Sequence, residues 1–345
     1  MPGARLARVS HEQSRQVLLA RRPEGWPEHD DFEPVTRDLP ELGEGEVRVA
    51  NEFVSVDPYM RGKMDDRESY TPPYALGEPL TGAAVGRVVA SRHPELSEGT
   101  LVLHQQGWRD AAQGRGEEFR AVPEVPDVPT SAYLGVLGGT GLTAYVGLLD
   151  IARMQPGETV FVSAAAGAVG SVVGQIARVK GAGRVVGSAG SPEKVRTLTE
   201  RYGFDAGFDH HDGPAADRLA EVAPDGVDVY FDNVGGEQLE AAIGALNRYG
   251  RVACCGAISA YNATEPPLGP RNLGRVVTHS LTLRGFIVSD HLDRQPDFLE
   301  EMGPWLREGR VRAEETVVDG VEHLVDAFLV LLRGANTGKM VVRVG

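Results

Sequence analysis

The sequence has little that could cross-link the chain or bind zinc. Its 345 residues include only two cysteines, the adjacent pair Cys254 and Cys255, which cannot build a disulfide framework. Such scarcity fits a reducing compartment, and we therefore expect a cytoplasmic protein. The nine histidines show no metal-ligand spacing, because His93 and His104 are isolated and the neighbours His210 and His211 cannot easily share one ion. These absences predict a functional site without a metal.

The sequence also lacks an excess of positive charge and any long, strongly apolar run. Its 35 Lys and Arg residues are outnumbered by 49 Asp and Glu residues, which gives a formal net charge of −14 at pH 7. An acidic chain repels phosphate backbones, so nucleic acid is not an expected partner. The uncharged stretch 159–177 is mostly Gly, Ala and Ser and is too weakly apolar for a membrane span. Residues 1–16 contain no apolar core of a signal peptide.

Two patterns of secondary structure divide the chain. Residues 1–128 consist of short β-rich runs separated by Gly and Pro, which is typical of a small, mostly β domain. After a helix expected over 135–154, strands alternate with helices, and this alternation predicts an α/β fold with a doubly wound parallel sheet. The strands are expected at 160–164, 184–190, 206–210, 227–234, 250–257 and 281–288, and the helices at 170–181, 191–203, 235–250 and 295–309.

The length of the chain fits two domains, and its last segment is again β-like. We expect a first domain over 1–128 and a dinucleotide-binding domain over 129–306. Residues 307–345 are expected to return and complete the first domain.

A glycine-rich segment between a predicted strand and a predicted helix is the strongest site signal. Gly167 would let the backbone pass close to a pyrophosphate, and Gly170 and Gly174 would let the helix lie close to the sheet. The free N–H groups and the dipole at the start of that helix attract phosphate charge. Ala165 replaces the first glycine of the usual G-x-G-x-x-G pattern. The alternative is a close-packed helix that binds no ligand.

The region after the second strand distinguishes between the two nicotinamide dinucleotides. Sites for NAD place an acidic residue about 20 residues beyond the glycines, where it holds the ribose hydroxyl. Here that region is 187–191, which contains no acid, and Lys194 follows it in the first turn of a helix for which Ser191 is the expected N-cap. Ser and Lys would receive a 2′-phosphate, whereas a carboxylate would repel it. The sequence therefore favours NADP(H), although Lys194 could also be an ordinary surface lysine.

Seven separated blocks of the sequence resemble one known family. They are SVDPYMRG (55–62), GGTGLTAYVGLLDI (138–151), AAAGAVGSVVGQIA (164–177), GSAGSPEKV (187–195), YFDNVGGE (230–237), CGAISAYN (255–262) and NTGKMVV (336–342). In this order they are similar to the zinc-independent medium-chain dehydrogenase/reductases, in the branch of leukotriene B4 12-hydroxydehydrogenase/15-oxo-prostaglandin 13-reductase and the 2-alkenal (double-bond) reductases. The resemblance implies a GroES-like domain joined to a Rossmann domain, and NADPH-dependent reduction of the C=C bond of α,β-unsaturated aldehydes and ketones.

The resemblance also implies roles for individual residues. His210 occupies a position where relatives often have a tyrosine near the 2′-phosphate, so its role stays open. The residues expected to bind NADP(H) are Gly167, Ala168, Val169, Gly170 and Ser171 at the pyrophosphate, Gly190, Ser191, Lys194 and His210 at the 2′-phosphate, Asn233 on the adenosine–phosphate side, Cys255, Gly256, Ala257, Ile258, Ser259 and Tyr261 along the cofactor, Phe286, Ile287 and Val288 beside the nicotinamide, and Asn336 above it.

Hydride addition to the β-carbon of an enone leaves negative charge on the carbonyl oxygen, which requires hydrogen-bond donors. The candidates are Tyr59, Tyr261 and the cofactor ribose, and our hypothesis is that no single side chain is indispensable. Tyr59 could instead be a tyrosine of the domain interface.

Two other functions stay open, an NADPH-dependent quinone reductase and a catalytically idle NADPH-binding protein. The resemblance further implies a homodimer that pairs through the edge strand 281–288.

Overall fold

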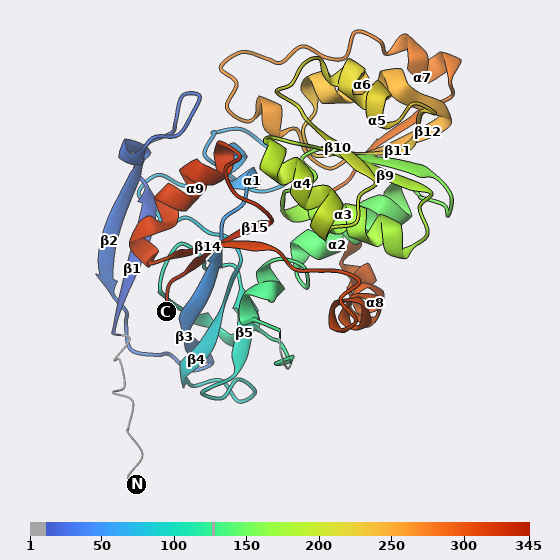
Figure 1. Ribbon diagram of the computed structural model, residues 1–345. Coiled ribbons are helices and arrows are strands. Elements are labelled where there is room, and N and C mark those ends of the chain that lie inside the picture. The colour runs from blue at the N-terminus through green and yellow to red at the C-terminus, as the bar shows by residue number, and fades with distance from the viewer. Residues whose placement is uncertain (1–11, 126–127) are drawn as a thin grey trace.

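The computed structural model describes residues 12–125 and 128–345, which form two lobes, each built around one sheet (Figure 1). The sheet of the first lobe has the strand order β14-β15-β3-β4-β5-β7, and β6 also pairs with β3. These strands are β3 (Glu46–Ser55), β4 (Ala84–Ser91), β5 (Leu101–His104), β6 (Ala111–Arg115), β7 (Arg120–Ala121), β14 (Glu315–Asp319) and β15 (Lys339–Arg343). A separate ribbon, β1 (Gln13–Leu19) with β2 (Phe32–Asp38), flanks the sheet.

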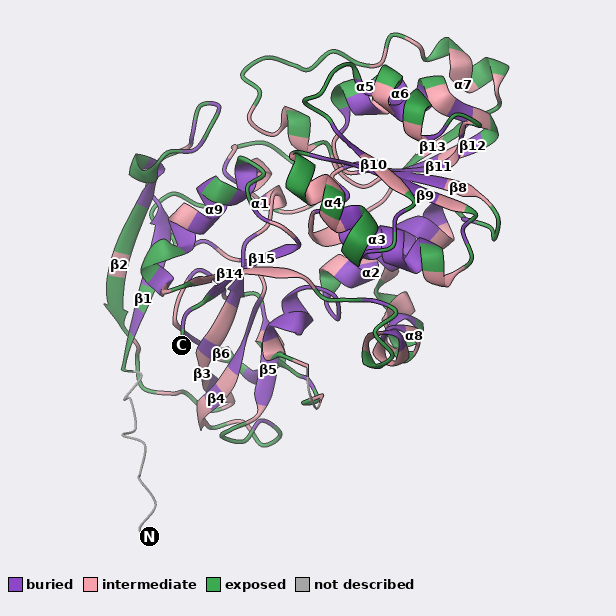
Figure 2. Ribbon diagram, viewed as in Figure 1, coloured by how far each residue is buried: buried purple, intermediate pink, exposed green. Residues whose placement is uncertain are grey.

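The second lobe confirms the predicted α/β class. Its six strands lie in the order β10-β9-β8-β11-β12-β13, and every neighbouring pair is parallel. Their bounds are β8 (Thr159–Val162), β9 (Arg184–Ala189), β10 (Ala206–Asp209), β11 (Val227–Asp232), β12 (Leu246–Cys254) and β13 (Thr282–Gly285). The central strands β8 and β11 are buried over most of their length because helices cover both faces of the sheet (Figure 2).

The helices of the second lobe form a layer on each side of the sheet. In Figure 1, α3 (Ala168–Val179) and α4 (Pro192–Arg201) lie against one face, and α5 (Ala215–Val222) and α6 (Gly236–Ala245) lie against the other. The remaining helices of this lobe are α2 (Gly139–Val146), α7 (Gly274–Thr278) and α8 (Gln295–Arg307). Among the described residues, none of the helices combines the length and the apolar character that crossing a membrane requires.

The last segment of the chain returns to the first lobe. Strand β15 pairs antiparallel with β3, with Val342 opposite Val54. Helix α9 (Leu324–Leu332) packs into the first-lobe core, where the ring of Phe328 lies 5.7 Å from Trp108 and 6.2 Å from Phe32. The remaining helix of this lobe, α1 (Tyr59–Lys63), follows β3 directly. The exact domain boundaries stay a prediction, and residues 1–11 and 126–127 lie outside the described part.

Three expected elements are shorter in the structure. The helix predicted over 135–154 is regular only in α2, and a π-helical turn follows at Gly147–Ile151. The helix predicted over 235–250 ends at Ala245, because β12 begins at Leu246 and pairs on both sides with β11 and β13. The strand predicted over 281–288 is only β13, and the chain turns after Gly285. Helices α5 and α9 were not expected.

Candidate functional site

The turn from β8 into α3 is built by close packing of backbone. A Cβ on Gly170 would lie 2.4 Å from the carbonyl oxygen of Ala164, and one on Gly174 would lie 2.0 Å from the ring of Phe204. Both glycines are therefore needed for helix α3 to approach the sheet, as the sequence predicted. Ala164 itself adopts a left-handed conformation, with φ of 48°.

The missing first glycine has a structural compensation on the next strand. Ala165 is completely buried, and a Cβ on Gly187 would lie 2.5 Å from the methyl group of Ala165. Gly187 in β9 therefore provides the space that Ala165 occupies in the turn. The departure from the usual glycine pattern leaves the geometry of the turn intact.

The N-terminus of α3 is open to a ligand. Gly167 is its N-cap in an extended conformation, and no side chain caps the helix. The next residues, Ala168 and Val169, are half-buried, and Ser171 is buried within the first turn. A helix start without a side-chain cap offers free N–H groups and the positive end of the dipole, so this donor set fits a pyrophosphate.

The residues expected at the 2′-phosphate lie together at the ends of β9 and β10. Ser191 is the N-cap of α4, as predicted, and its Oγ accepts a hydrogen bond from the Lys194 N–H at 3.3 Å. The ring of His210 lies 3.2 Å from the position of a Cβ on Gly190, and that of His211 lies 3.7 Å from it. The structure therefore brings Gly190, Ser191, Lys194 and His210 to one place, and sequence reasoning missed His211.

The return segment 334–338 lies across this same region. The Lys194 ammonium donates to the carbonyl oxygens of Gly334 at 2.5 Å and Asn336 at 2.6 Å, and burial lowers the pKa of Lys194. Gly338 donates its N–H to the Ala166 carbonyl oxygen at 2.8 Å, and Asn336 is buried. Asn336 is therefore close to the glycine-rich turn, although it comes from the other lobe.

The carboxyl ends of β8 and β11 are joined through Asn233. Its side-chain amide donates to the Ser163 carbonyl oxygen at 2.8 Å, and its N–H donates to the Ser163 hydroxyl at 2.9 Å. The buried Asp232 carboxylate accepts from the Tyr230 hydroxyl at 2.7 Å and the Gly235 N–H at 2.8 Å. Sequence reasoning missed Asp232, although an acid that ends a buried strand is an available signal.

The loop after β12 is tied to that same turn. The N–H groups of Cys255 and Gly256 donate to the Asp232 carbonyl oxygen at 2.9 and 3.0 Å, and Ile258 donates to Asn233 at 3.2 Å. The Ser259 hydroxyl donates to the Val234 carbonyl oxygen at 2.6 Å. These bonds keep the expected cofactor-lining residues Cys255, Gly256, Ala257, Ile258, Ser259 and Tyr261 beside the carboxyl end of β11.

Phe286, Ile287 and Val288 are half-buried just after β13. The ring of Phe286 meets Phe231 edge-on at 6.4 Å, and a Cβ on Gly147 would lie 2.6 Å from Phe286. The π-helical turn that begins at Gly147 therefore makes room for the aromatic side of the site, in keeping with the frequent occurrence of π-turns at functional sites.

Four tyrosines extend the site toward the first lobe. Burial, and then the charge of Asp57 and the neighbouring Tyr70, raise the pKa of Tyr59 well above its ordinary value. The pKa of Tyr70 rises to about 12, first through loss of hydration and then through Tyr261, Asp57 and Cys255. Burial also raises the pKa of Tyr74 and Tyr261. Tyr70 is therefore close both to Tyr59 of the first lobe and to Tyr261 of the second, and all four phenols are hydrogen-bond donors at neutral pH.

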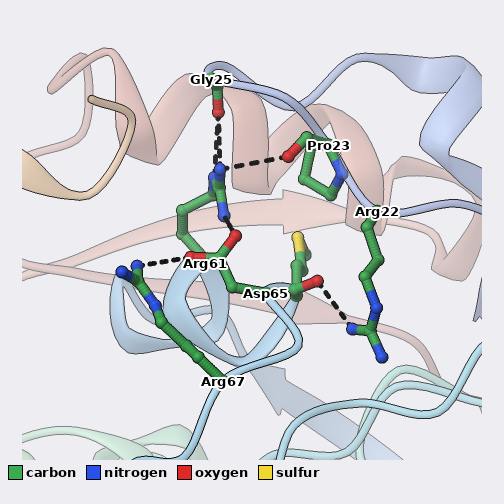
Figure 3. Close-up of polar contacts among 7 residues, drawn as sticks. Arg22, Pro23, Gly25, Arg61, Asp65 and Arg67 are labelled. Carbon is green, nitrogen blue, oxygen red and sulfur yellow. Dashed lines mark hydrogen bonds and ion pairs between the residues drawn. The ribbon is translucent and has the colours of Figure 1, made fainter. Parts of the chain in front are cut away.

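Helix α1, which carries Tyr59, is fixed by the buried side chain of Arg61 (Figure 3). The Arg61 guanidinium donates to the Gly25 carbonyl oxygen at 2.9 and 3.0 Å and pairs with Asp65 at 2.7 Å. Arg22 donates to the Met64 carbonyl oxygen at the end of the helix. A helix of only five residues gains a defined orientation from these bonds.

Among the residues that the structure describes, no group of three candidate metal ligands lies at the tyrosines. In the described part of the chain, the one group of three candidate ligands is Asp209, His210 and His211, whose ligand atoms lie within 4.8 Å of one another. The expectation that adjacent histidines cannot share an ion is therefore wrong, because the turn after β10 brings both rings to one side. These residues lie at the 2′-phosphate region, so a zinc centre for hydride chemistry does not fit the donors present around Tyr59 and Tyr261.

Two family models match most of the chain. One is described as the N-terminal domain of oxidoreductase and matches residues 15–122, and the other is described as zinc-binding dehydrogenase and matches residues 168–306. The chain belongs to the medium-chain dehydrogenase/reductase family, in its zinc-independent, NADP-dependent branch.

The relatives define that branch more closely. The chain is 45% identical over 333 residues to the putative NADP-dependent oxidoreductase YfmJ of Bacillus subtilis, covering 96% of this chain and 97% of the relative. It is 43% identical to the NADPH-dependent curcumin reductase of Escherichia coli, again over 96% and 97% of the two chains. The crystal structure of CurA from Vibrio vulnificus in complex with NADPH is 41% identical and superimposes with a TM-score of 0.91, over 96% of this chain and 99% of that one.

Proposed function

We propose that this protein reduces the C=C bond of α,β-unsaturated ketones and aldehydes with NADPH. The observation that carries the proposal is a pair of protonated phenols, Tyr59 and Tyr261, which both interact with Tyr70, in a protein with an uncapped dinucleotide-type helix start. Among the described residues, no zinc donor set lies beside these phenols. Similar proteins support it, since they include a 2-alkenal reductase of Nicotiana tabacum at 40% identity and a prostaglandin reductase of Mus musculus at 43%.

NADPH, when bound, supplies the hydride that adds to the β-carbon of the substrate. The open start of α3, with Gly167 to Ser171, would bind the pyrophosphate. Lys194, with Ser191 and His210, would bind the 2′-phosphate, and the lysine already presents its ammonium at that corner. Water would be excluded from the nicotinamide side by Phe286, Ile287 and Val288. Asn336 would lie above the nicotinamide.

The protein's own contribution to the chemistry is the placement of hydrogen-bond donors. As hydride arrives, charge moves to the carbonyl oxygen, and phenols with raised pKa values donate hydrogen bonds to that oxygen without ionising. The proton that completes the product at the α-carbon comes from water. The role of each tyrosine is part of this proposal.

The quinone reductase alternative has weaker support. The quinone oxidoreductase of Escherichia coli in complex with NADPH is only 20% identical, with a TM-score of 0.75, and such a likeness establishes the fold alone. An idle NADPH-binding protein would need a dismantled site, whereas the described site has its tyrosines and its glycine-rich turn in place.

One experiment separates these functions. NADPH oxidation is followed with trans-2-alkenals and alkenones, with a quinone and with no acceptor, and products are identified by mass spectrometry. We expect saturated aldehydes and ketones, and no change in rate after treatment with a chelator. Turnover only with the quinone would favour the alternative, and NADPH binding without turnover on any acceptor would favour the idle protein.

Strand β13 is at the edge of the second sheet, so a second copy could extend that sheet, and we propose a homodimer formed there.

The scarcity of cysteine, with both thiols free, supports a cytoplasmic location. Fractionation of the native host cell with an antibody against the protein would test the location.

A further inference from the structure

Helix α1 presents a second side chain on the same face as Tyr59. Lys63 follows Tyr59 by four residues, one helical turn along, so the two side chains are neighbours on one face. Arg61 is buried on another face and is tied to Gly25 and Asp65, which prevents rotation of the helix (Figure 3). If Tyr59 borders the substrate, Lys63 borders the same space.

The surroundings of the Lys63 ammonium agree with that placement. Its Nζ lies 4.3 Å from the centre of the Tyr74 ring and 3.3 Å from the Thr81 hydroxyl oxygen. The Tyr59 hydroxyl oxygen lies beside the next residue, Gly82, at 3.8 Å from the position that a Cβ on this glycine would occupy. The ammonium and the Tyr59 hydroxyl therefore meet neighbouring residues of one segment, beside the tyrosines of the site.

Three acids close to Lys63 in the sequence are engaged by other cations. Asp57 pairs with the buried Lys339 at 3.0 Å, Asp65 pairs with Arg61 at 2.7 Å and with Arg67, and Asp66 pairs with Arg22 at 3.7 Å. Within residues 12–125 and 128–345, no carboxylate oxygen forms an ion pair with Lys63. The described part of the protein therefore supplies no ion-pair partner for this ammonium.

The chain has four lysines, and the other three are partnered. Lys180 pairs with Glu301, Lys339 pairs with Asp57, and Lys194 donates to two carbonyl oxygens. Lys63 is half-buried, and its loss of hydration lowers the pKa of the ammonium. A partly desolvated cation without a counter-ion gains free energy when an anion binds beside it.

We propose that Lys63 determines substrate specificity by binding a carboxylate carried on the enone substrate. The carbonyl oxygen would then meet Tyr59, and the carboxylate would lie about 5–6 Å further along the face of α1. The Lys63 ammonium, which forms no ion pair with a described carboxylate, would then distinguish acidic substrates from neutral ones. The inference rests on the proposed enone reductase function.

The test compares one medium-chain enone that ends in a carboxylate with its methyl ester, which has the same conjugated system without the charge. The variants are Lys63→Gln, Lys63→Arg, which keeps the charge, and Lys180→Gln as a control that removes a lysine remote from the tyrosines. We expect the wild type to favour the acid over the ester by about tenfold or more in kcat/KM. Lys63→Gln should abolish that preference through KM, whereas Lys63→Arg and Lys180→Gln should keep it.

Two results would overturn the assignment of Lys63. One is equal turnover of acid and ester by the wild type, and the other is an equal loss for both substrates in Lys63→Gln. Binding of the saturated acid to the NADP⁺-loaded protein, measured by calorimetry, gives a reading that does not need turnover. If no enone is reduced, the proposed function fails, while weaker binding of the acid to Lys63→Gln than to wild type would still support the carboxylate site.

Discussion

At the scale of single residues, the proposed stabilisation of the oxyanion depends on Tyr59 and Tyr261. Their raised pKa values keep both phenols protonated, so each can donate to a developing oxyanion. Because the cofactor ribose is a third donor, we expect Tyr59→Phe and Tyr261→Phe each to lower kcat by less than about a hundredfold. Steady-state kinetics with a trans-2-alkenone measure this. A loss of several orders of magnitude in one variant, with NADPH affinity intact, would make that tyrosine indispensable and contradict the hypothesis.

Lys194 should set the preference for NADPH. Replacement by Gln removes the cation expected at the 2′-phosphate, so the KM for NADPH should rise about tenfold or more while the KM for NADH stays nearly constant. The exposed Arg196 on the same helix provides a control, since Arg196→Gln removes a charge two residues beyond Lys194. An equal rise for both cofactors in Lys194→Gln would instead indicate that the lysine serves only to attach segment 334–338.

His104 should make the protein sensitive to acid. It is buried, its Nε2 is 2.9 Å from the Asn51 side-chain oxygen, and burial, followed by the charge of Arg109, lowers its pKa from 6.5 to about 3. Because the folded pKa lies below the unfolded value, the unfolded state takes up the proton first as pH falls below 6.5. Stability should therefore fall between pH 6.5 and 3, by about 3 kcal/mol at pH 4 relative to pH 7.

The variant His104→Gln keeps a hydrogen-bonding amide but cannot titrate. Urea unfolding at several pH values should show a smaller decrease toward acid in this variant than in the wild type, whatever its stability at pH 7. Parallel curves for the two proteins between pH 7 and 4 would show that His104 does not cause the loss.

At the scale of secondary-structure elements, helix α3 can pack against Phe204 because Gly174 has no side chain. A Cβ on Gly174 would lie 2.0 Å from the Phe204 ring, so Gly174→Ala should destabilise the protein by about 1–3 kcal/mol through overpacking. Gly303 in α8 has no atom within 4 Å of a Cβ position, and there Gly303→Ala should be neutral or stabilising by up to about 1 kcal/mol. Thermal unfolding compares the two variants, and similar effects would contradict the packing argument.

The elements also show where sequence patterns stop being informative. Strands β8 to β11 and helices α3 and α4 lie close to their predicted positions, since their apolar runs are bounded by glycine or a cap such as Ser191. Helix α6 and strand β12 share one continuous pattern, and the boundary at Leu246 is decided by pairing with β11. Helix α9 has seven buried residues, so its apolar run carried no helical period to detect.

At the scale of the whole molecule, the exposed edge of the second sheet predicts self-association. Val277, in the helix α7 that precedes β13, is 81% exposed, so its apolar side chain would lose contact with water if a second copy paired there. We expect light scattering after size-exclusion chromatography to give twice the mass of one chain. Val277→Glu should shift that mass toward one chain, whereas Val330→Glu on α9, in the other lobe, should not. A single-chain mass for the wild type would exclude the dimer.

Sequence alone determined the class of fold, the cofactor and the family, because these depend on local patterns: the alternation of strands and helices, the glycines of one turn, and the missing acid before Lys194. It did not reveal how Gly187 makes room for Ala165, how segment 334–338 reaches Lys194, or that Asp57, Asp65 and Asp66 pair with cations other than Lys63. Most of those facts depend on contacts between residues far apart in the chain, so only the tertiary packing decides which side chains meet.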